Sequence, residues 1–223
     1  MNKILVISAH PDDETLGVGG TLLKHKSNGD QLFWLNATKI DNGDPILTER
    51  FNQREKEIQK VSQLYGFKEF IQLNYITTQL NSKSKISMIS EISKILTRLK
   101  PEIIYVVNRS DSHSDHRYLF ESFYSASKTF RQPSIKKILM YECISETEFS
   151  APLNENVFIP NYFVDITPFL DEKLKIMKVY SSEISEPPFP RSEKNIRALA
   201  TFRGSTAGVI AAEAFQTLKI IDK

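Results

Sequence analysis

The sequence predicts an α/β fold, a three-layer sandwich in which helices cover both faces of a mostly parallel sheet. Short apolar runs rich in β-branched residues alternate along the chain with longer segments in which apolar residues recur at helical spacing. Alternation of this kind is typical of a parallel sheet, because each helix carries the chain back to the start of the next strand. The 223 residues contain no internal repeat, and they suit one domain spanning 1–223.

The first half of the chain contains four expected strands separated by three expected helices. The strands cover 3–9, 31–38, 69–75 and 102–108, and the helices cover 14–30, 46–67 and 85–100. The first helix closes at Gly29 and the second at Gly66, because glycine after a periodic segment is a common helix end. Pro101 ends the third helix, and a turn is expected at 39–44.

The second half continues the alternation. Strands are expected at 135–142 and 161–167, and helices at 116–130, 168–182 and 191–204. Pro168 suits the first turn of its helix, and the last helix is expected to end at Gly204. The stretch "SEPPFPRS" is expected to be a mobile or lid-forming loop at 186–191, because its prolines block regular structure.

Composition narrows the class of protein. The formal net charge is only +2, which gives no electrostatic case for a nucleic-acid partner or an anionic membrane. No run reaches the roughly 20 apolar residues of a membrane span, so no membrane insertion is expected. The single cysteine, Cys143, excludes an internal disulfide, and the N-terminus lacks the pattern of a signal peptide. We expect a cytoplasmic protein, and the sequence leaves a homo-oligomer open.

Two clusters of polar residues follow the ends of expected strands. "HPDDE" runs from His10 to Glu14 after the first strand, and "HSDH" runs from His113 to His116 after the fourth. In open parallel sheets, ligands bind beyond the carboxyl ends of the strands. If these two strands are neighbours, the two clusters converge on one site.

The clusters contain the residue types of a catalytic zinc site. Two imidazoles and one carboxylate are a common ligand set for catalytic zinc, and they leave a position for water. We predict His10, Asp13 and His116 as the ligands, because His10 and Asp13 are three residues apart on a turn. Asp12 would then lie beside the metal without binding it, where a carboxylate can take a proton from the attacking water.

The remaining residues of the second cluster suggest an oxyanion site. His113, protonated and held by Asp115, is expected to stabilise negative charge that develops on a substrate oxygen.

A structural explanation of the acidic cluster competes with the metal site. Asp12, Asp13 and Glu14 stand in the first turn of an expected helix, where carboxylates are stabilised by the helix dipole and by capping. We expect that role for Glu14.

Two further features of the first helix receive structural explanations. Gly17, Gly19 and Gly20 follow three acids and do not form a dinucleotide-binding pattern, so we expect them to permit close packing against the sheet. His25 has no acidic neighbour within "LLKHKSNG" and is expected to be a solvated helix residue.

The stretch "AHPDDE", with "LGVGGTLLKHKSNGD" after it and "HSDH" at a distance, resembles the LmbE-like, PIG-L de-N-acetylase family. Supporting similarity extends along most of the chain, through "REKEIQKVSQLYGF", "NYFVDITPFLDEKLKIMKVYSSE" and "PRSEKNIRALATFRGSTAGVIAAEAF". The chain departs from the family pattern at Ser114, where proline is frequent, and at Glu183, where glutamine is common.

The resemblance implies a Rossmann-like fold, one zinc per subunit and removal of an N-acetyl group from a glucosamine-type sugar. The family's metal ligands, base and oxyanion-stabilising histidine fall on the residues predicted above. Its pocket arginine falls on Arg54, for which a solvated helix face is the alternative. The implied substrate is an N-acetylated amino sugar or a conjugate of one, including a nucleotide sugar in surface polysaccharide synthesis.

Two other functions remain open at this point. One is a non-catalytic sugar- or nucleotide-binding module, in which the acids merely cap a helix. The other is a zinc amidase that acts on a different acyl amide. Arg109 and Arg191 join Arg54 as residues able to bind a phosphate, although each is of a type that is often solvated.

Overall fold

The computed structural model describes residues 1–41, 43 and 45–222, and it confirms the predicted α/β class. The sheet has seven strands in the order β3-β2-β1-β4-β5-β7-β6. The strands are β1 (Lys3–Ser8), β2 (Gln31–Lys39), β3 (Glu69–Ile76), β4 (Ile103–Val107), β5 (Lys137–Tyr141), β6 (Tyr162–Asp165) and β7 (Ala212–Ile220). Within the described residues only β7 runs antiparallel to its neighbours, so the sheet is mostly parallel.

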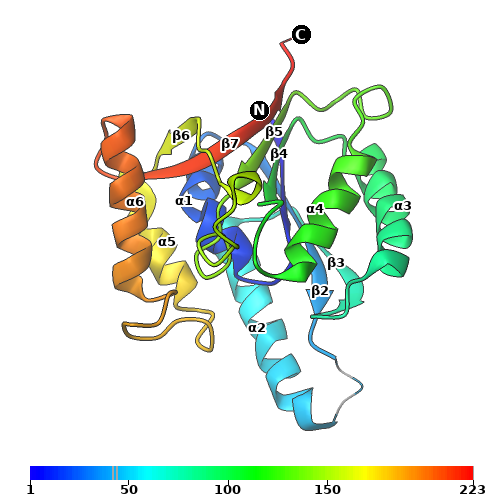
Figure 1. Cartoon of the computed structure of the whole chain (residues 1–223), viewed down its shortest axis with the longest axis horizontal. Coiled ribbons are helices and arrows are strands. Elements are labelled where there is room, and N and C mark those ends of the chain that lie inside the picture. The colour runs from blue at the N-terminus through cyan, green and yellow to red at the C-terminus, as the bar shows by residue number, and fades with distance from the viewer. Residues whose placement is uncertain (42, 44, 223) are drawn as a thin grey trace.

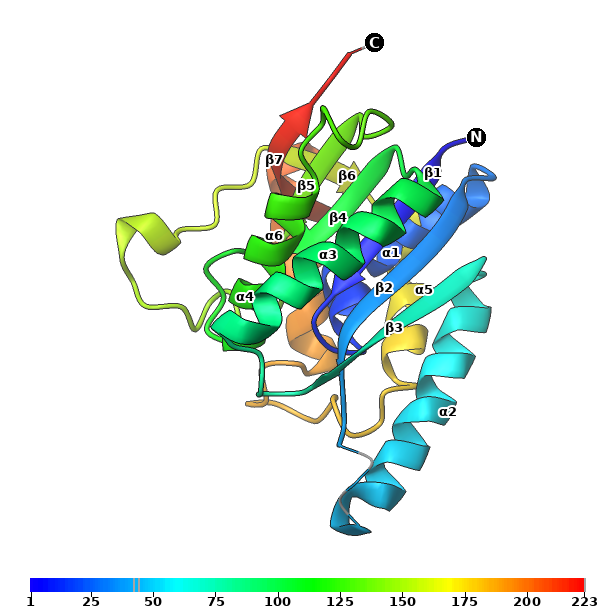
Figure 2. The ribbon, with the colours of Figure 1, turned by 90° about the vertical axis from the view of Figure 1, so that its right-hand side faces the viewer.

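Helices cover both faces of this sheet (Figure 1). One face carries α1 (Asp13–Ser27), α2 (Thr48–Tyr65), α5 (Leu170–Met177) and α6 (Glu193–Ala207). Figure 2 shows α3 (Ser82–Leu99) and α4 (Ser114–Ala126) lying side by side on the other face. Short 3₁₀ turns occupy Pro45–Leu47, Asn154–Asn156 and Thr167–Phe169. No helix among the described residues is long and apolar enough to cross a membrane.

Strand β1 lies at the centre and fixes the position of the site. Ile4 to Ile7 are all buried, as expected of a strand covered on both faces. Ile4 pairs with Leu32 of β2 on one side and with Ile103 of β4 on the other. After β1 the chain adds β2 and β3 on one side of it, and then crosses to add β4 on the other side. The order of the strands therefore reverses between β1 and β4, and open α/β sheets bind ligands at such a point.

Helix ends are set by local chemistry. Gly66 ends α2 with a left-handed φ of 75°, as predicted. The side chain of Asn81 accepts hydrogen bonds from the backbone N–H groups of Lys83 and Ser84 and starts α3 in a capping box.

Two sequence predictions about the C-terminal part were wrong. No strand was expected after Gly204, yet β7 occupies that part of the sheet; its alanine-rich start has low strand propensity and no alternating pattern. Helix α6 passes through Gly204 and ends at Gly208, whose φ is 72°. A Cβ at position 204 would lie 2.7 Å from the carbonyl oxygens of Val209 and Ile210, so Gly204 serves close packing. The turn expected at 39–44 lies partly outside the described residues.

The glycines of α1 permit close packing, as predicted. A Cβ on Gly17 would lie 2.2 Å from the ring of Tyr141 in β5, and one on Gly20 would lie 2.7 Å from Ile166. Gly19 instead faces the hydroxyl of Tyr65 and the aliphatic stem of Lys173.

Candidate active site

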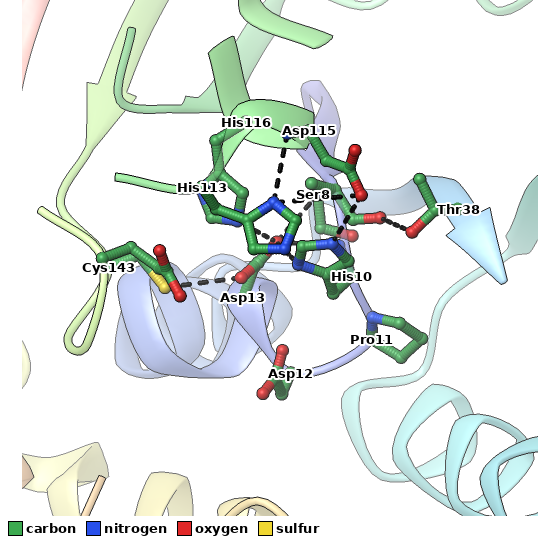
Figure 3. A network of polar contacts seen from close by, with 12 residues as sticks. Ser8, His10, Pro11, Asp12, Asp13, Thr38, His113, Asp115, His116 and Cys143 are labelled. Atoms are coloured by element: carbon green, nitrogen blue, oxygen red, sulfur yellow. Dashed lines mark hydrogen bonds and ion pairs between the residues drawn. The ribbon is translucent and has the colours of Figure 1, made fainter. Parts of the chain in front are cut away.

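The two polar clusters meet beyond the carboxyl ends of β1 and β4. His10 follows β1 and stands just before α1, while His116 lies in the first turn of α4. The imidazole centroids of these two residues are 5.3 Å apart, although more than one hundred positions separate them in the sequence. Figure 3 shows His10, Asp13 and His116 turned toward one another.

Three atoms converge at the centre of this cluster. His116 Nε2 lies 3.4 Å from Asp13 Oδ2, and His10 Nδ1 lies 4.0 Å from the same oxygen. The backbone N–H groups of Ala9 and His10 donate to that oxygen at 2.9 and 2.8 Å and fix the carboxylate. His116 Nε2 is buried and has no hydrogen-bond partner among the described residues. A buried nitrogen left without a partner beside a carboxylate fits a metal ligand.

Two further carboxylates hold the far sides of both imidazoles. His116 Nδ1 donates to Asp111 Oδ2 at 2.8 Å, and His10 Nε2 donates to Asp115 Oδ2 at 3.1 Å. Each bond fixes a tautomer and leaves the other ring nitrogen, facing Asp13, without a proton when the ring is neutral, which is the usual arrangement behind metal-binding histidines.

The sequence analysis missed Asp111. It is fully buried, and its side chain also accepts hydrogen bonds from Asn108 and Thr147. The available signal was an acid five residues before His116 in a loop that follows a buried strand.

The carboxylates of the centre favour positive charge on the neighbouring imidazoles. Burial lowers the pKa of His116, but the nearby carboxylates of Asp13 and Asp111 outweigh burial and raise it well above its usual value. Burial likewise raises the pKa of Asp13, but His116 and His10 outweigh burial and hold it below its usual range. A cation bound between these groups would take the place of the proton.

A second group of side chains is close enough to hold a metal: His10, His113 and Asp115. Its facing atoms already have partners, because Asp115 Oδ2 accepts from His10 and from the backbone N–H of Thr78. One oxygen of Asp115 lacks a partner among the described residues, as does His116 Nε2. The set of His10, Asp13 and His116 fits better, since in that set two ring nitrogens are free of other bonds.

Asp12 lies next to this centre in a strained conformation. Its φ of 137° is one that residues other than glycine rarely adopt, and such strain is concentrated at functional sites. Its carboxylate points away from the histidines (Figure 3) and lines the neighbouring cavity. Burial, followed by the charges of Asp13 and Glu183, raises the pKa of Asp12 well above its usual value. A metal cation nearby would act in the opposite direction.

His113 differs from its predicted geometry. It is the N-cap of α4, and its Nδ1 accepts the backbone N–H of Asp115 at 3.1 Å. The Asp115 carboxylate, expected on His113, lies 3.9 Å from that nitrogen and is bonded to His10 instead. Burial and then the charge of His10 lower the pKa of His113. Because Nδ1 accepts a backbone N–H, the proton of the neutral ring lies on Nε2, which is able to donate one hydrogen bond.

A cavity of about 200 Å³ opens beside the candidate metal centre of His10, Asp13 and His116. Its wall includes Asp12 and His113, together with Arg54 from α2, Glu183, and Arg191 from the proline-rich loop. Arg54 is 8% exposed, which excludes the solvated helix face that was its alternative. Its Nη1 donates to the carbonyl of Pro11 at 2.8 Å, so Arg54 also supports the turn that carries Asp12.

Glu14 takes the structural role predicted for it. Its Oε2 accepts the backbone N–H of Asp12 at 3.0 Å, and its Oε1 accepts the hydroxyls of Thr15 and Tyr180. Burial raises its pKa to about 7. Glu14 thus anchors the start of α1.

A buried ion pair anchors the middle of α1. Lys173 Nζ donates to the carbonyl of Leu16 and to Glu213 Oε1, both at 2.7 Å. The carboxylate of Glu213 accepts the backbone N–H groups of Gly20 at 2.8 Å and Thr21 at 2.7 Å. In a regular α-helix the N–H of Gly20 would donate to the carbonyl of Leu16. Here Lys173 binds that carbonyl and Glu213 binds that N–H, so the ion pair contacts both groups.

The expectation for His25 was wrong. His25 Nδ1 donates to Asp30 Oδ2 at 2.7 Å, and Tyr105 OH lies 2.9 Å from its Nε2. Asp30 lies beyond the helix end, so the backbone reversal at Gly29, rather than helical spacing, brings the acid to the ring.

Comparisons with known proteins agree with this geometry. Residues 5–127 match the family model described as PIG-L: GlcNAc-PI de-N-acetylase. The chain is 24% identical over 215 residues to the diacetylchitobiose deacetylase of Thermococcus kodakarensis, covering 93% of this chain and 80% of that protein. It is 22% identical over 195 residues to a probable N-acetyl-α-D-glucosaminyl L-malate deacetylase 2 of Bacillus anthracis, covering 82% and 81%.

The fold of the chain is also similar to that of a solved deacetylase structure. The N,N'-diacetylchitobiose deacetylase of Pyrococcus horikoshii, complexed with an inhibitor, aligns with a TM-score of 0.77 at 26% identity, covering 97% of this chain and 84% of that one. The resemblance stated from the sequence is confirmed: this chain belongs to the PIG-L family of GlcNAc-PI de-N-acetylases.

Proposed function

We propose that the protein is a zinc-dependent hydrolase that removes the N-acetyl group from an N-acetylated amino sugar or sugar conjugate. The observation that carries this proposal is the unpartnered Nε2 of His116, which faces Asp13 and His10 while a buried carboxylate holds its other nitrogen. A helix-capping role for the acids would not require two imidazoles to converge on the carboxylate of Asp13.

His10, Asp13 and His116 would hold one zinc ion per chain. Bound there, zinc would act as a Lewis acid toward the acetamido carbonyl and would lower the pKa of water.

The chain's own residues supply the proton transfers. Asp12 takes a proton from the water as its oxygen attacks the carbonyl carbon, and His113 donates a hydrogen bond from Nε2–H to the oxygen that becomes negative, while the proton stays on the ring. The C–N bond then breaks, the amine leaves with the proton from Asp12, and acetate is released. Both side chains line the same cavity, so one bound acetamido group can reach both.

The substrate class is supported by the family and by its named relatives. One relative is named for a neutral chitobiose derivative and another for a malate conjugate, which carries carboxylates. A nucleotide sugar is the less favoured conjugate for this chain. Arg109, one candidate for binding its diphosphate, donates to the carbonyl of Glu155 and is not part of the cavity wall.

An acetate-release screen tests the proposal. The protein is stripped of metal, assayed on N-acetylated sugars, and assayed again after zinc is restored. We expect acetate release only when zinc is present. The variant Asp13→Ala is expected neither to bind zinc nor to release acetate. Asp30→Asn is the matched control, because it removes the carboxylate of a histidine–aspartate pair outside the site. Equal release from acetylated peptides would favour a general amidase, and absence of bound zinc would favour a binding module.

A further inference from the structure

Glu183 stands between two arginines in the wall of the cavity. Arg54 Nη2 donates to one oxygen of its carboxylate, and Arg191 Nη2 donates to the other at 2.9 Å. Arg191 Nε also donates to the Glu183 carbonyl at 2.9 Å. The Glu183 side chain is 14% exposed, so both ion pairs are largely shielded from water. We call this group of three residues the arginine clamp.

The remaining guanidinium nitrogens of the clamp are also occupied. Arg54 Nη1 donates to the carbonyl of Pro11, and its Nε lies 3.3 Å from Glu57 Oε2. Arg191 Nη1 donates to Ser145 Oγ at 2.8 Å. All three nitrogens of each guanidinium thus have a protein partner, and neither arginine presents an unpaired fork to a ligand.

The rest of the cavity does not favour an anion either. Asp12, Glu55 and Glu146 add carboxylates to its wall. The other cations of the wall are Lys39 and Arg50, and the Arg50 side chain is 63% exposed, so water and salt screen its charge. Away from the proposed metal, a phosphate or carboxylate on the substrate would therefore gain no free guanidinium, and Lys39 and the exposed Arg50 would be the only wall cations outside the clamp among the described residues.

We propose that Glu183 is a specificity-determining residue that restricts the site to substrates uncharged near the reacting acetamido sugar. Specificity of this kind depends on a repulsive element as well as on attractive contacts. The inference rests on the proposed deacetylase function and goes beyond it by assigning the charge of the substrate.

The kinetic test compares a neutral and an anionic substrate on zinc-loaded protein. We measure kcat/KM for N-acetylglucosamine and for N-acetylglucosamine 6-phosphate. The parent is expected to prefer the neutral sugar, and Glu183→Gln is expected to shift the ratio about tenfold toward the phosphate. An unchanged ratio in Glu183→Gln, or a parent that prefers the phosphate, overturns the proposal.

Two variants separate charge from mere bracing. Glu146→Gln removes a carboxylate from the same wall, one that accepts a hydrogen bond from Ser112 and forms no ion pair with an arginine among the described residues. It is expected to shift the ratio less than Glu183→Gln does, and an equal shift overturns the clamp argument. Glu183→Asp keeps the charge while shortening the side chain, so it is expected to retain the parent preference; a bracing role would make Glu183→Asp as altered as Glu183→Gln.

A binding measurement keeps the test independent of catalysis. Inorganic phosphate is titrated by calorimetry into zinc-loaded parent and zinc-loaded Glu183→Gln. Any contribution of the metal is common to both, so tighter binding by Glu183→Gln reports the released arginines, and equal binding overturns the proposal. If no N-acetyl sugar is hydrolysed, the deacetylase function fails while this measurement still decides whether Glu183 excludes anions.

Discussion

The proposed metal centre and the arginine clamp line the same cavity, and both are clusters of buried charge. They differ in how completely their nitrogen atoms are hydrogen-bonded. In the clamp, five of the six guanidinium nitrogens donate hydrogen bonds, and the sixth, Arg54 Nε, lies 3.3 Å from Glu57 Oε2. In the metal centre, His116 Nε2 has none, although the carboxylate of Asp111 holds the same ring. Buried polar groups are normally satisfied, so an unsatisfied imidazole nitrogen that faces a carboxylate and a second imidazole is a candidate ligand position, while a satisfied cluster shapes what may enter.

The largest expected effect comes from Asp12, which lies between the two regions. Asp12→Asn is expected to lower kcat about 10²- to 10⁴-fold, because it removes the proton acceptor. Asparagine tolerates positive φ, so the strained turn is preserved. Zinc content, measured on the same preparation, is expected to stay at the parent value; loss of zinc would make Asp12 a ligand instead.

The next effect tests which histidines belong to the metal centre. His113→Ala is expected to lower kcat about 10²- to 10³-fold by removing one donor to the oxyanion. Metal analysis should find zinc retained. If zinc is lost, the alternative group of His10, His113 and Asp115 holds the metal.

A smaller effect is expected behind the metal centre. Asp111→Asn weakens the hold on His116, and zinc affinity measured by chelator competition is expected to fall about 10- to 100-fold. Asp30→Asn alters the similar pair with His25 and is expected to leave zinc affinity at the parent value. Equal losses in both variants would mean that the change acts through general stability.

Local pattern was enough to predict the parts of the molecule that depend on neighbours in sequence. The apolar run at 3–9 predicted a buried strand, and the convergence of His10 and His116 followed once β1 and β4 proved to be neighbours. What was missed depends on contacts fixed only by the fold. Asp111 looks like any loop acid until the loop buries it. Asp115 sits two residues from His113, yet the sheet brings His10 closer to its carboxylate.

The same limit applied to the C-terminal strand. Its antiparallel pairing between β5 and β6 is a property of the assembled sheet, and its sequence does not alternate along its whole length as a half-exposed strand would. Arg54 was identified through family resemblance. Its pairing with Glu183 depends on how the loop before α6 folds back toward α2.

The ion pair of Lys173 and Glu213 makes the start of the chain dependent on its end. All three proposed zinc ligands lie before residue 117, but the helix that begins at Asp13 has backbone groups bound by side chains from α5 and β7. A fragment that stops after α4 would contain every ligand and still lack the two side chains that complete this helix. The helix that carries Asp13 is therefore completed only by side chains from α5 and the last strand.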